Sequence, residues 1–373
     1  MRLIAFLFLI SLISCGRQNS KISGELNSPD FAKGFYIIYE KDFIILKVLN
    51  PWQNAENVEF TYILTGEKSV IPDSLNKFPV IKTPVRKVIA LSTTHIGFIS
   101  ILEESESIVG ISGENFVNDR IVHKSIAEKK CFDVGYFPNI NFERILSLKP
   151  DVVFLYGLDA TVQSTSVRLA EAGIPCVMVS EYLENHPLGK AEWIKFFAAF
   201  YNKDKSADIF FDEVKEKYIH LRDTVEILTS KPTVLAGLPW KDTWFLPGGK
   251  SFSVQFIADA GGDYLWKDDT SREFIPLDLE SVFSRALNAD IWINTGSVAT
   301  KAELLDRDKR FGVVKAFMSD SLFNNNARLS AGGGNDYWES GVASPQIILQ
   351  DLIEIFHPGF LPKHDLLYYR RLE

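Results

Sequence analysis

Two glutamates occupy matching positions in a pattern that the sequence contains twice. The segments NFERILSLKPDVVFLYG, from position 141, and DLESVFSRALNADIWINTG, from position 278, begin alike and each end in an apolar run closed by glycine. Asn141 and Asp278 are suitable helix N-caps, which places Glu143 and Glu280 at the second helical position. The helix dipole stabilises such a carboxylate by about 0.3–1 kcal/mol, which explains either glutamate alone. A matched pair on two rigid elements also suits recognition of a two-fold symmetric partner that carries arginines.

A second set of residues has the chemistry to bind a ligand. These aromatic and polar side chains follow apolar runs that we expect to be strands, where open α/β sheets bind their ligands. Tryptophan and tyrosine offer flat apolar faces with a polar edge, and arginine can pair with an anionic group. The candidates are Thr94, His95, Tyr136, Tyr156, Trp240, Trp244, Arg272 and Trp338.

His95 has two interpretations at this stage. Its imidazole could ligate a metal ion, or it could cap the helix that follows the STT segment. The sequence predicts no metal site built by the protein alone, because it has no Cys-x-x-Cys and no paired-histidine motif.

The composition and motifs argue against several other functions. A formal net charge of −8 argues against a general nucleic-acid binder, which needs a basic surface. The sequence has no Gly-x-Ser-x-Gly elbow or nucleotide fingerprint, and LPGGKSF lacks the first glycine of a phosphate-binding loop. Paired carboxylates of a glycosidase lie within about 5–10 Å, whereas Glu143 and Glu280 are expected on different lobes. We therefore expect a binding protein and not an enzyme.

The candidate residues require two sheets to position them. Residues 85–186 and 232–373 alternate short apolar runs with helical patterns, which predicts parallel sheets covered by helices. Residues 187–231 predict connecting helices, one of them long and free of glycine and proline. Residues 35–84 predict about three antiparallel strands. The expected fold is α/β, with two lobes of mainly parallel sheets joined by a single long helix and a small N-terminal β appendage.

The N-terminus predicts export and lipid anchoring. Residues 1–14 have a basic start and an apolar run too short to span a bilayer, as in a signal peptide. The run ends in Leu-Ile-Ser-Cys, which resembles a bacterial lipoprotein cleavage box and implies acylation of Cys15. The alternative is a secreted protein in which this cysteine is incidental. Residues 15–34 are polar and suit a tether.

Two further cysteines, Cys131 and Cys176, each lie at the start of an apolar run. An exported protein can form disulfides, but two buried free thiols fit the sequence as well. The pairing stays open at this stage.

From residue 85 to about residue 360 the chain resembles the substrate-binding proteins of ABC importers for vitamin B12, iron–siderophores and haem. The resemblance rests on RKVIALSTTHIGFISILE, SIVGIS, the two repeated segments and the long connecting helix. It implies that the lobes clasp a metal chelate and that Glu143 and Glu280 form salt bridges with arginines of a permease dimer.

The resemblance also implies a monomer without a resident cofactor, on the periplasmic or cell-surface side of a bacterial membrane. We expect the ligand to be an iron complex, either a siderophore or haem. Cobalamin and a surface capture lipoprotein without a permease are the alternatives. The β appendage and the late segment NNNARLSAGGGNDYWESG depart from the family pattern.

Overall fold

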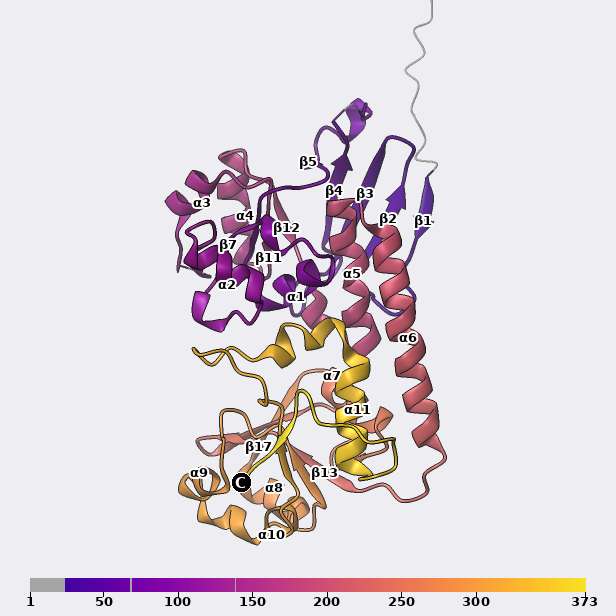
Figure 1. Cartoon of the computed structure of the whole chain (residues 1–373), viewed down its shortest axis with the longest axis vertical. Helices are drawn as coiled ribbons and strands as arrows, with labels where there is room; N and C mark the ends of the chain where they lie inside the picture. The colour runs from indigo at the N-terminus through magenta and orange to yellow at the C-terminus, as the bar shows by residue number, and fades with distance from the viewer. Residues whose placement is uncertain (1–23, 68, 138) are drawn as a thin grey trace, which may run out of the picture.

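The computed structural model describes residues 24–67, 69–137 and 139–373, and Cys15 lies outside them. Two lobes, one above the other in Figure 1, are joined along one side by helices. This arrangement confirms the expected α/β fold with two lobes. None of the described helices is long and apolar enough to cross a membrane.

Lobe 1 is built on a parallel sheet with strand order β12-β11-β6-β7-β8. Apolar side chains fill its strands on both faces, since helices cover both sides. The strands are β6 (Val88–Ala90), β7 (Ile108–Ile111), β8 (Phe132–Asp133), β11 (Val152–Leu155) and β12 (Cys176–Met178). The helices are α1 (Thr93–Ile101), α2 (Arg120–Ala127), α3 (Phe142–Leu148) and α4 (Val162–Glu171), and a short hairpin joins β9 (Gly135–Tyr136) to β10 (Asn139–Ile140).

Lobe 2 repeats this plan with strand order β16-β13-β18-β19-β20, in which only β20 runs antiparallel to its neighbour. A second, antiparallel sheet has the order β14-β15-β17. The strands are β13 (Thr233–Ala236), β14 (Pro239–Trp240), β15 (Thr243–Pro247), β16 (Asp263–Tyr264), β17 (Phe274–Asp278), β18 (Ile291–Ile293), β19 (Leu322–Asn324) and β20 (Arg370–Arg371). The helices are α7 (Phe252–Asp259), α8 (Leu279–Ala286), α9 (Lys301–Arg307), α10 (Lys315–Met318) and α11 (Pro345–Phe356).

Two helices connect the lobes. All of α5 (Pro187–Tyr201) except Lys195 is buried, and its aromatic side chains form part of the lobe 1 core. It ends at Asn202, whose φ of 56° breaks the helix before α6 (Asp204–Glu226). The long helix α6 packs against α5 and against α11 of lobe 2, so it spans both lobes along one side (Figure 1).

The N-terminal β appendage is a five-stranded sheet and not the expected three strands. Its strands are β1 (Glu25–Asn27), β2 (Phe35–Tyr39), β3 (Phe43–Leu49), β4 (Glu59–Thr65) and β5 (Val80–Lys82), all antiparallel except the pair β4–β5. The sequence predicted a tether over residues 15–34. Residues 25–27 instead form β1, which pairs with β2, and residues 30–34 bond to Glu192 and Glu184, so residues 25–34 belong to the folded part.

The appendage is fixed to lobe 1 by buried polar contacts. The carboxylate of Glu192 accepts hydrogen bonds from the backbone N–H groups of residues 30–32, at 2.8–3.0 Å. Glu184 accepts from the N–H groups of Lys33 and Gly34. The Tyr62 hydroxyl accepts a hydrogen bond from the Met178 N–H, at 2.9 Å. The appendage is therefore part of one body with lobe 1.

Candidate functional site

A cavity of about 250 Å³ lies between the lobes. Lobe 1 lines it with the segment before α5 and with one lysine of α5 itself. Lobe 2 lines it with the start of α7, the loop before β17 and one tryptophan from the C-terminal region. The lining residues are Tyr182, Glu184, Asn185, Lys190, Pro247, Ser251, Phe252, Ser253, Arg272, Glu273, Phe274 and Trp338.

A second and wider cavity of about 480 Å³ adjoins the first, and Arg272, Glu184 and Asn185 line both. Ligand pockets for small molecules generally have volumes of about 300–1,000 Å³. The volume of the wider cavity falls in this range. The narrower cavity adjoins it and adds aromatic lining residues.

In lobe 1, a hydrogen bond links the cavity lining to the loop that follows β11, where the strand order of the sheet reverses. Strands β6 and β11 are neighbours, and the chain leaves them toward opposite sides of the sheet, which is where α/β folds bind ligands. Thr94 follows β6 and Tyr156 follows β11. The Tyr182 hydroxyl, at the cavity, donates a hydrogen bond of 2.7 Å to the Gly157 carbonyl.

Two buried ionisable groups lie at or next to the cavity, Lys190 in its lining and Glu181 beside it. The ammonium of Lys190 donates a hydrogen bond of 3.1 Å to the Tyr182 carbonyl and lies 4.5 Å from the centre of the Phe252 ring of lobe 2. Burial lowers the pKa of Lys190 to about 8. Glu181 accepts a hydrogen bond of 2.5 Å from the Thr94 hydroxyl, and burial raises the pKa of this carboxyl group. Lys190 and Glu181 interact electrostatically within lobe 1, and the Phe252 ring brings lobe 2 against this lysine.

Two of the predicted ligand residues line the cavity between the lobes. Arg272 has an exposed guanidinium, and the Trp338 side chain is 43 % exposed. Tyr136, Tyr156 and Trp240 are also exposed, but they do not line either cavity described above. Thr94 is half-buried and holds Glu181, so it lies behind the cavity.

Trp244 was expected to contact the ligand, and its position in the fold contradicts this. The indole is fully buried in lobe 2, where it packs against Trp292 and Phe311 and donates a hydrogen bond to the Ala236 carbonyl. Strand β15 alternates its side chains between two faces, and Trp244 points to the core face. Trp244, which the sequence placed in a loop near glycine and proline, is therefore a core residue of strand β15.

Both interpretations of His95 are also wrong in this structure. The N-cap of α1 is Ser92, and the imidazole of His95 is fully buried against the rings of Phe154, Tyr156 and Phe197. Neither ring nitrogen has a hydrogen-bond partner among the described residues, and burial lowers the pKa of His95 to about 3. The ring is therefore neutral and packs as a core residue.

A family model described as periplasmic binding protein matches residues 88–324, which is more than half of the chain. The chain belongs to the periplasmic binding protein family. Two lipoproteins of Methanocaldococcus jannaschii, described as uncharacterized, are each 29% identical to it. The matches cover 88% and 86% of this chain and 81% and 82% of those proteins.

Solved structures share the fold of this periplasmic binding protein. A possible iron-binding protein from Staphylococcus epidermidis has a TM-score of 0.57 at 18% identity and covers 73% of this chain and 99% of its own. A periplasmic haem-binding protein from Pseudomonas aeruginosa has a TM-score of 0.59 at 15% identity and covers 78% of this chain and 98% of its own. The family consists of binding proteins, consistent with the expectation of a non-enzyme.

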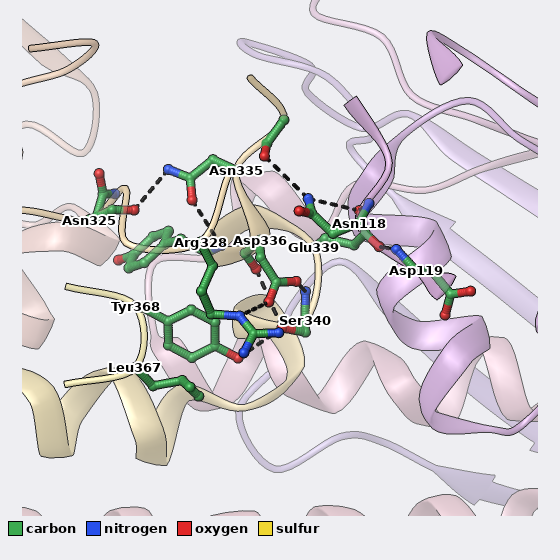
Figure 2. Close-up of polar contacts among 12 residues, drawn as sticks. Asn118, Asp119, Asn325, Arg328, Asn335, Asp336, Glu339, Ser340, Leu367 and Tyr368 are labelled. Carbon is green, nitrogen blue, oxygen red and sulfur yellow. Dashed lines mark hydrogen bonds and ion pairs between the residues drawn. The ribbon is translucent and has the colours of Figure 1, made fainter. Parts of the chain in front are cut away.

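The late glycine-rich segment of this periplasmic binding protein crosses from lobe 2 to lobe 1 (Figure 2). We call residues 328–340 the strap. The carboxylate of Glu339 accepts hydrogen bonds of 2.7 Å from the backbone N–H groups of Asn118 and Asp119 at the start of α2. The Asn118 amide donates to the Gly334 carbonyl, and the Ser330 hydroxyl donates to the Asn115 carbonyl.

Glycine allows the strap to lie this close to lobe 1. A Cβ atom on Gly97 of α1 would lie 2.0 Å from the carbonyl oxygen of Glu339. A Cβ atom on Gly334 would lie 1.9 Å from the carbonyl oxygen of Phe116. The glycines of AGGGND therefore allow a close backbone approach between the strap and lobe 1.

The two repeated segments form the helices that the sequence predicts. Asn141 accepts a hydrogen bond of 2.9 Å from the Arg144 N–H at the start of α3, and Asp278 accepts one of 2.8 Å from the Ser281 N–H at the start of α8. Glu143 is exposed on α3. Glu280 is also exposed, but it forms a salt bridge of 2.6 Å with Arg310. This intramolecular partner was not anticipated.

Several lining residues were missed in the sequence. Lys190 lies near the start of α5, and a lysine flanked there by apolar helix residues was the available signal. Phe252 and Phe274 begin elements of lobe 2 and resembled ordinary core residues. Among the residues that the structure describes, Cys131 and Cys176 are buried free thiols, so they do not pair with each other.

Proposed function

We propose that this periplasmic binding protein captures an iron complex of the siderophore or haem type between its lobes and delivers it to an ABC permease. The observation that carries the proposal is the cavity between the lobes, which Phe252, Phe274 and Trp338 line together with the exposed Arg272. Aromatic faces suit a flat or aromatic chelate, and a guanidinium suits its anionic oxygens. The descriptions of the Staphylococcus and Pseudomonas proteins as iron-binding and haem-binding support this class of ligand.

Glu143 and Glu280 are the proposed contacts to the permease. Each lies exposed near the start of a helix, one in each lobe. The salt bridge between Glu280 and Arg310 joins two exposed side chains, and such pairs contribute only about 0–1 kcal/mol. An arginine of a permease can therefore replace Arg310 at low cost.

Acylated Cys15 is the proposed anchor, which would hold the protein on the outer side of a membrane. The support is the cleavage box in the sequence and the description of the two Methanocaldococcus relatives as lipoproteins. Two or more acyl chains anchor a protein stably, whereas one chain binds reversibly.

Isothermal titration of the acyl-free Cys15→Ser protein with haem, iron(III) tris-catecholate and cyanocobalamin tests the proposal. We expect saturable one-to-one binding of haem or of the catecholate complex. Tight binding of cyanocobalamin alone would assign the protein to vitamin B12 instead. Absence of binding to all three probes would overturn the proposal.

A further inference from the structure

The wider of the two cavities has three walls, and the β appendage forms one of them. Lobe 1 contributes the segment from Ser180 to His186, and lobe 2 contributes Lys250 and Arg272, among others. The appendage contributes Lys33 with its neighbours Phe31 and Gly34, and the β3 end at Leu49 and Asn50. A ligand that fills this cavity therefore touches all three parts of the molecule.

The appendage wall is held rigidly at the cavity. The carboxylate of Glu184 accepts hydrogen bonds of 2.9 Å from the N–H groups of Lys33 and Gly34. Phe31 packs 5.1 Å from His186 and 6.3 Å from Phe211, measured between ring centres. These contacts fix the backbone from which the Lys33 side chain projects.

Positive charge dominates the lining of this cavity. Lys33, Lys250 and Arg272 are exposed, and none of them has an ion-pair partner within residues 24–67, 69–137 and 139–373. Glu184 is the acidic residue of the lining, and backbone N–H groups and the Trp193 indole already occupy its oxygens. The cations therefore remain available to a ligand.

One buried hydroxyl at this cavity also lacks a partner. Ser180 is 1 % exposed, and its Oγ atom has no hydrogen bond in the described structure. A buried polar group without a partner costs about 1–3 kcal/mol, so a ligand oxygen that pairs with this hydroxyl would recover that cost.

We propose that the appendage completes the ligand site and that the wider cavity takes the anionic oxygens of the chelate. Lys33, Lys250 and Arg272 bind the negative charge, and Ser180 pairs with one oxygen. The aromatic part of the chelate lies in the adjoining cavity between the lobes. This assignment rests on the proposed function and selects anionic chelates over uncharged ones.

Titration of the full-length chain carrying Cys15→Ser with two iron complexes of opposite character tests this inference. The probes are the anionic iron(III) tris-catecholate and an uncharged iron(III) tris-hydroxamate. Each of Lys33→Gln, Lys250→Gln and Arg272→Gln is expected to weaken binding of the anionic complex about tenfold, or about 1.4 kcal/mol. Added salt is expected to weaken it as well.

Lys82→Gln is the matched control, because Lys82 is exposed on β5 of the same appendage and does not line the cavity. If Lys33→Gln bound the anionic complex as tightly as the wild type while Arg272→Gln bound it more weakly, the appendage would be excluded from the ligand site. A wild-type preference for the uncharged complex would overturn the inference while leaving the proposed function intact. Failure of both complexes, haem and cyanocobalamin to bind the wild-type protein would remove the proposed function and this inference together.

Discussion

At the scale of single residues, tryptophans of similar sequence context have opposite roles. Trp244 and Trp338 both lie in segments that look like loops, yet one is core and the other lines the cavity. The difference arises from the pairing of β15 with β17, which places Trp244 opposite Leu277 in a sheet. This pairing joins segments about thirty residues apart and is not visible in local sequence.

The two tryptophans give the first prediction. Trp244→Ala removes a buried indole and is expected to lower the free energy of unfolding by about 3–5 kcal/mol. Trp338→Ala is expected to change it by less than about 1 kcal/mol but to weaken binding of haem or iron(III) tris-catecholate about tenfold. Urea unfolding and isothermal titration measure the two effects. Equal affinity in Trp338→Ala and the wild-type protein would remove Trp338 from the site.

At the scale of elements, the helices and sheets were predicted well because they depend on local periodicity. The two capped helices α3 and α8, the break at Asn202 and both parallel sheets follow from patterns of a few residues. The strap and the appendage wall were not predicted, since both depend on contacts between residues more than 140 positions apart. The candidate site was found only in part for the same reason.

The strap provides a prediction about pH. Burial, with a smaller effect of Asp336, raises the pKa of Glu339 to about 7 from its ordinary value of 4.5. The folded protein therefore binds this proton more tightly than the unfolded chain does. The resulting stability is complete below about pH 4.5 and is lost as the pH rises through about 7.

Glu339→Gln should remove this part of the pH dependence. Urea unfolding of both proteins between pH 4.5 and 8 measures it, and the wild-type free energy of unfolding is expected to fall more steeply with rising pH than that of the variant. Asp351→Asn is unsuitable as a control because Asp351 is buried and accepts several hydrogen bonds. Glu216→Gln on the exposed side of α6 serves instead. Parallel curves for wild type and Glu339→Gln would contradict the assignment.

At the scale of the whole molecule, α6 limits how far the lobes can move. A helix that packs on both lobes, together with a strap that bonds lobe 2 to the start of α2, favours a small change on ligand binding. Under the proposed function, release of the ligand then requires an outside force on the lobes. The exposed glutamates Glu143 and Glu280, one in each lobe, are suited to receive it.

This requirement gives the last prediction. The double variant Glu143→Lys, Glu280→Lys is expected to abolish chelate uptake by cells that depend on this protein, because each lobe would repel the arginines of the permease. Its affinity for the chelate should stay within about twofold of wild type, since neither glutamate lines either of the two cavities described above. Glu216→Lys is the control for added charge, and it should leave uptake unchanged. Normal uptake by the double variant would exclude docking through these residues, whereas a loss of affinity in titration would place them in the ligand site instead.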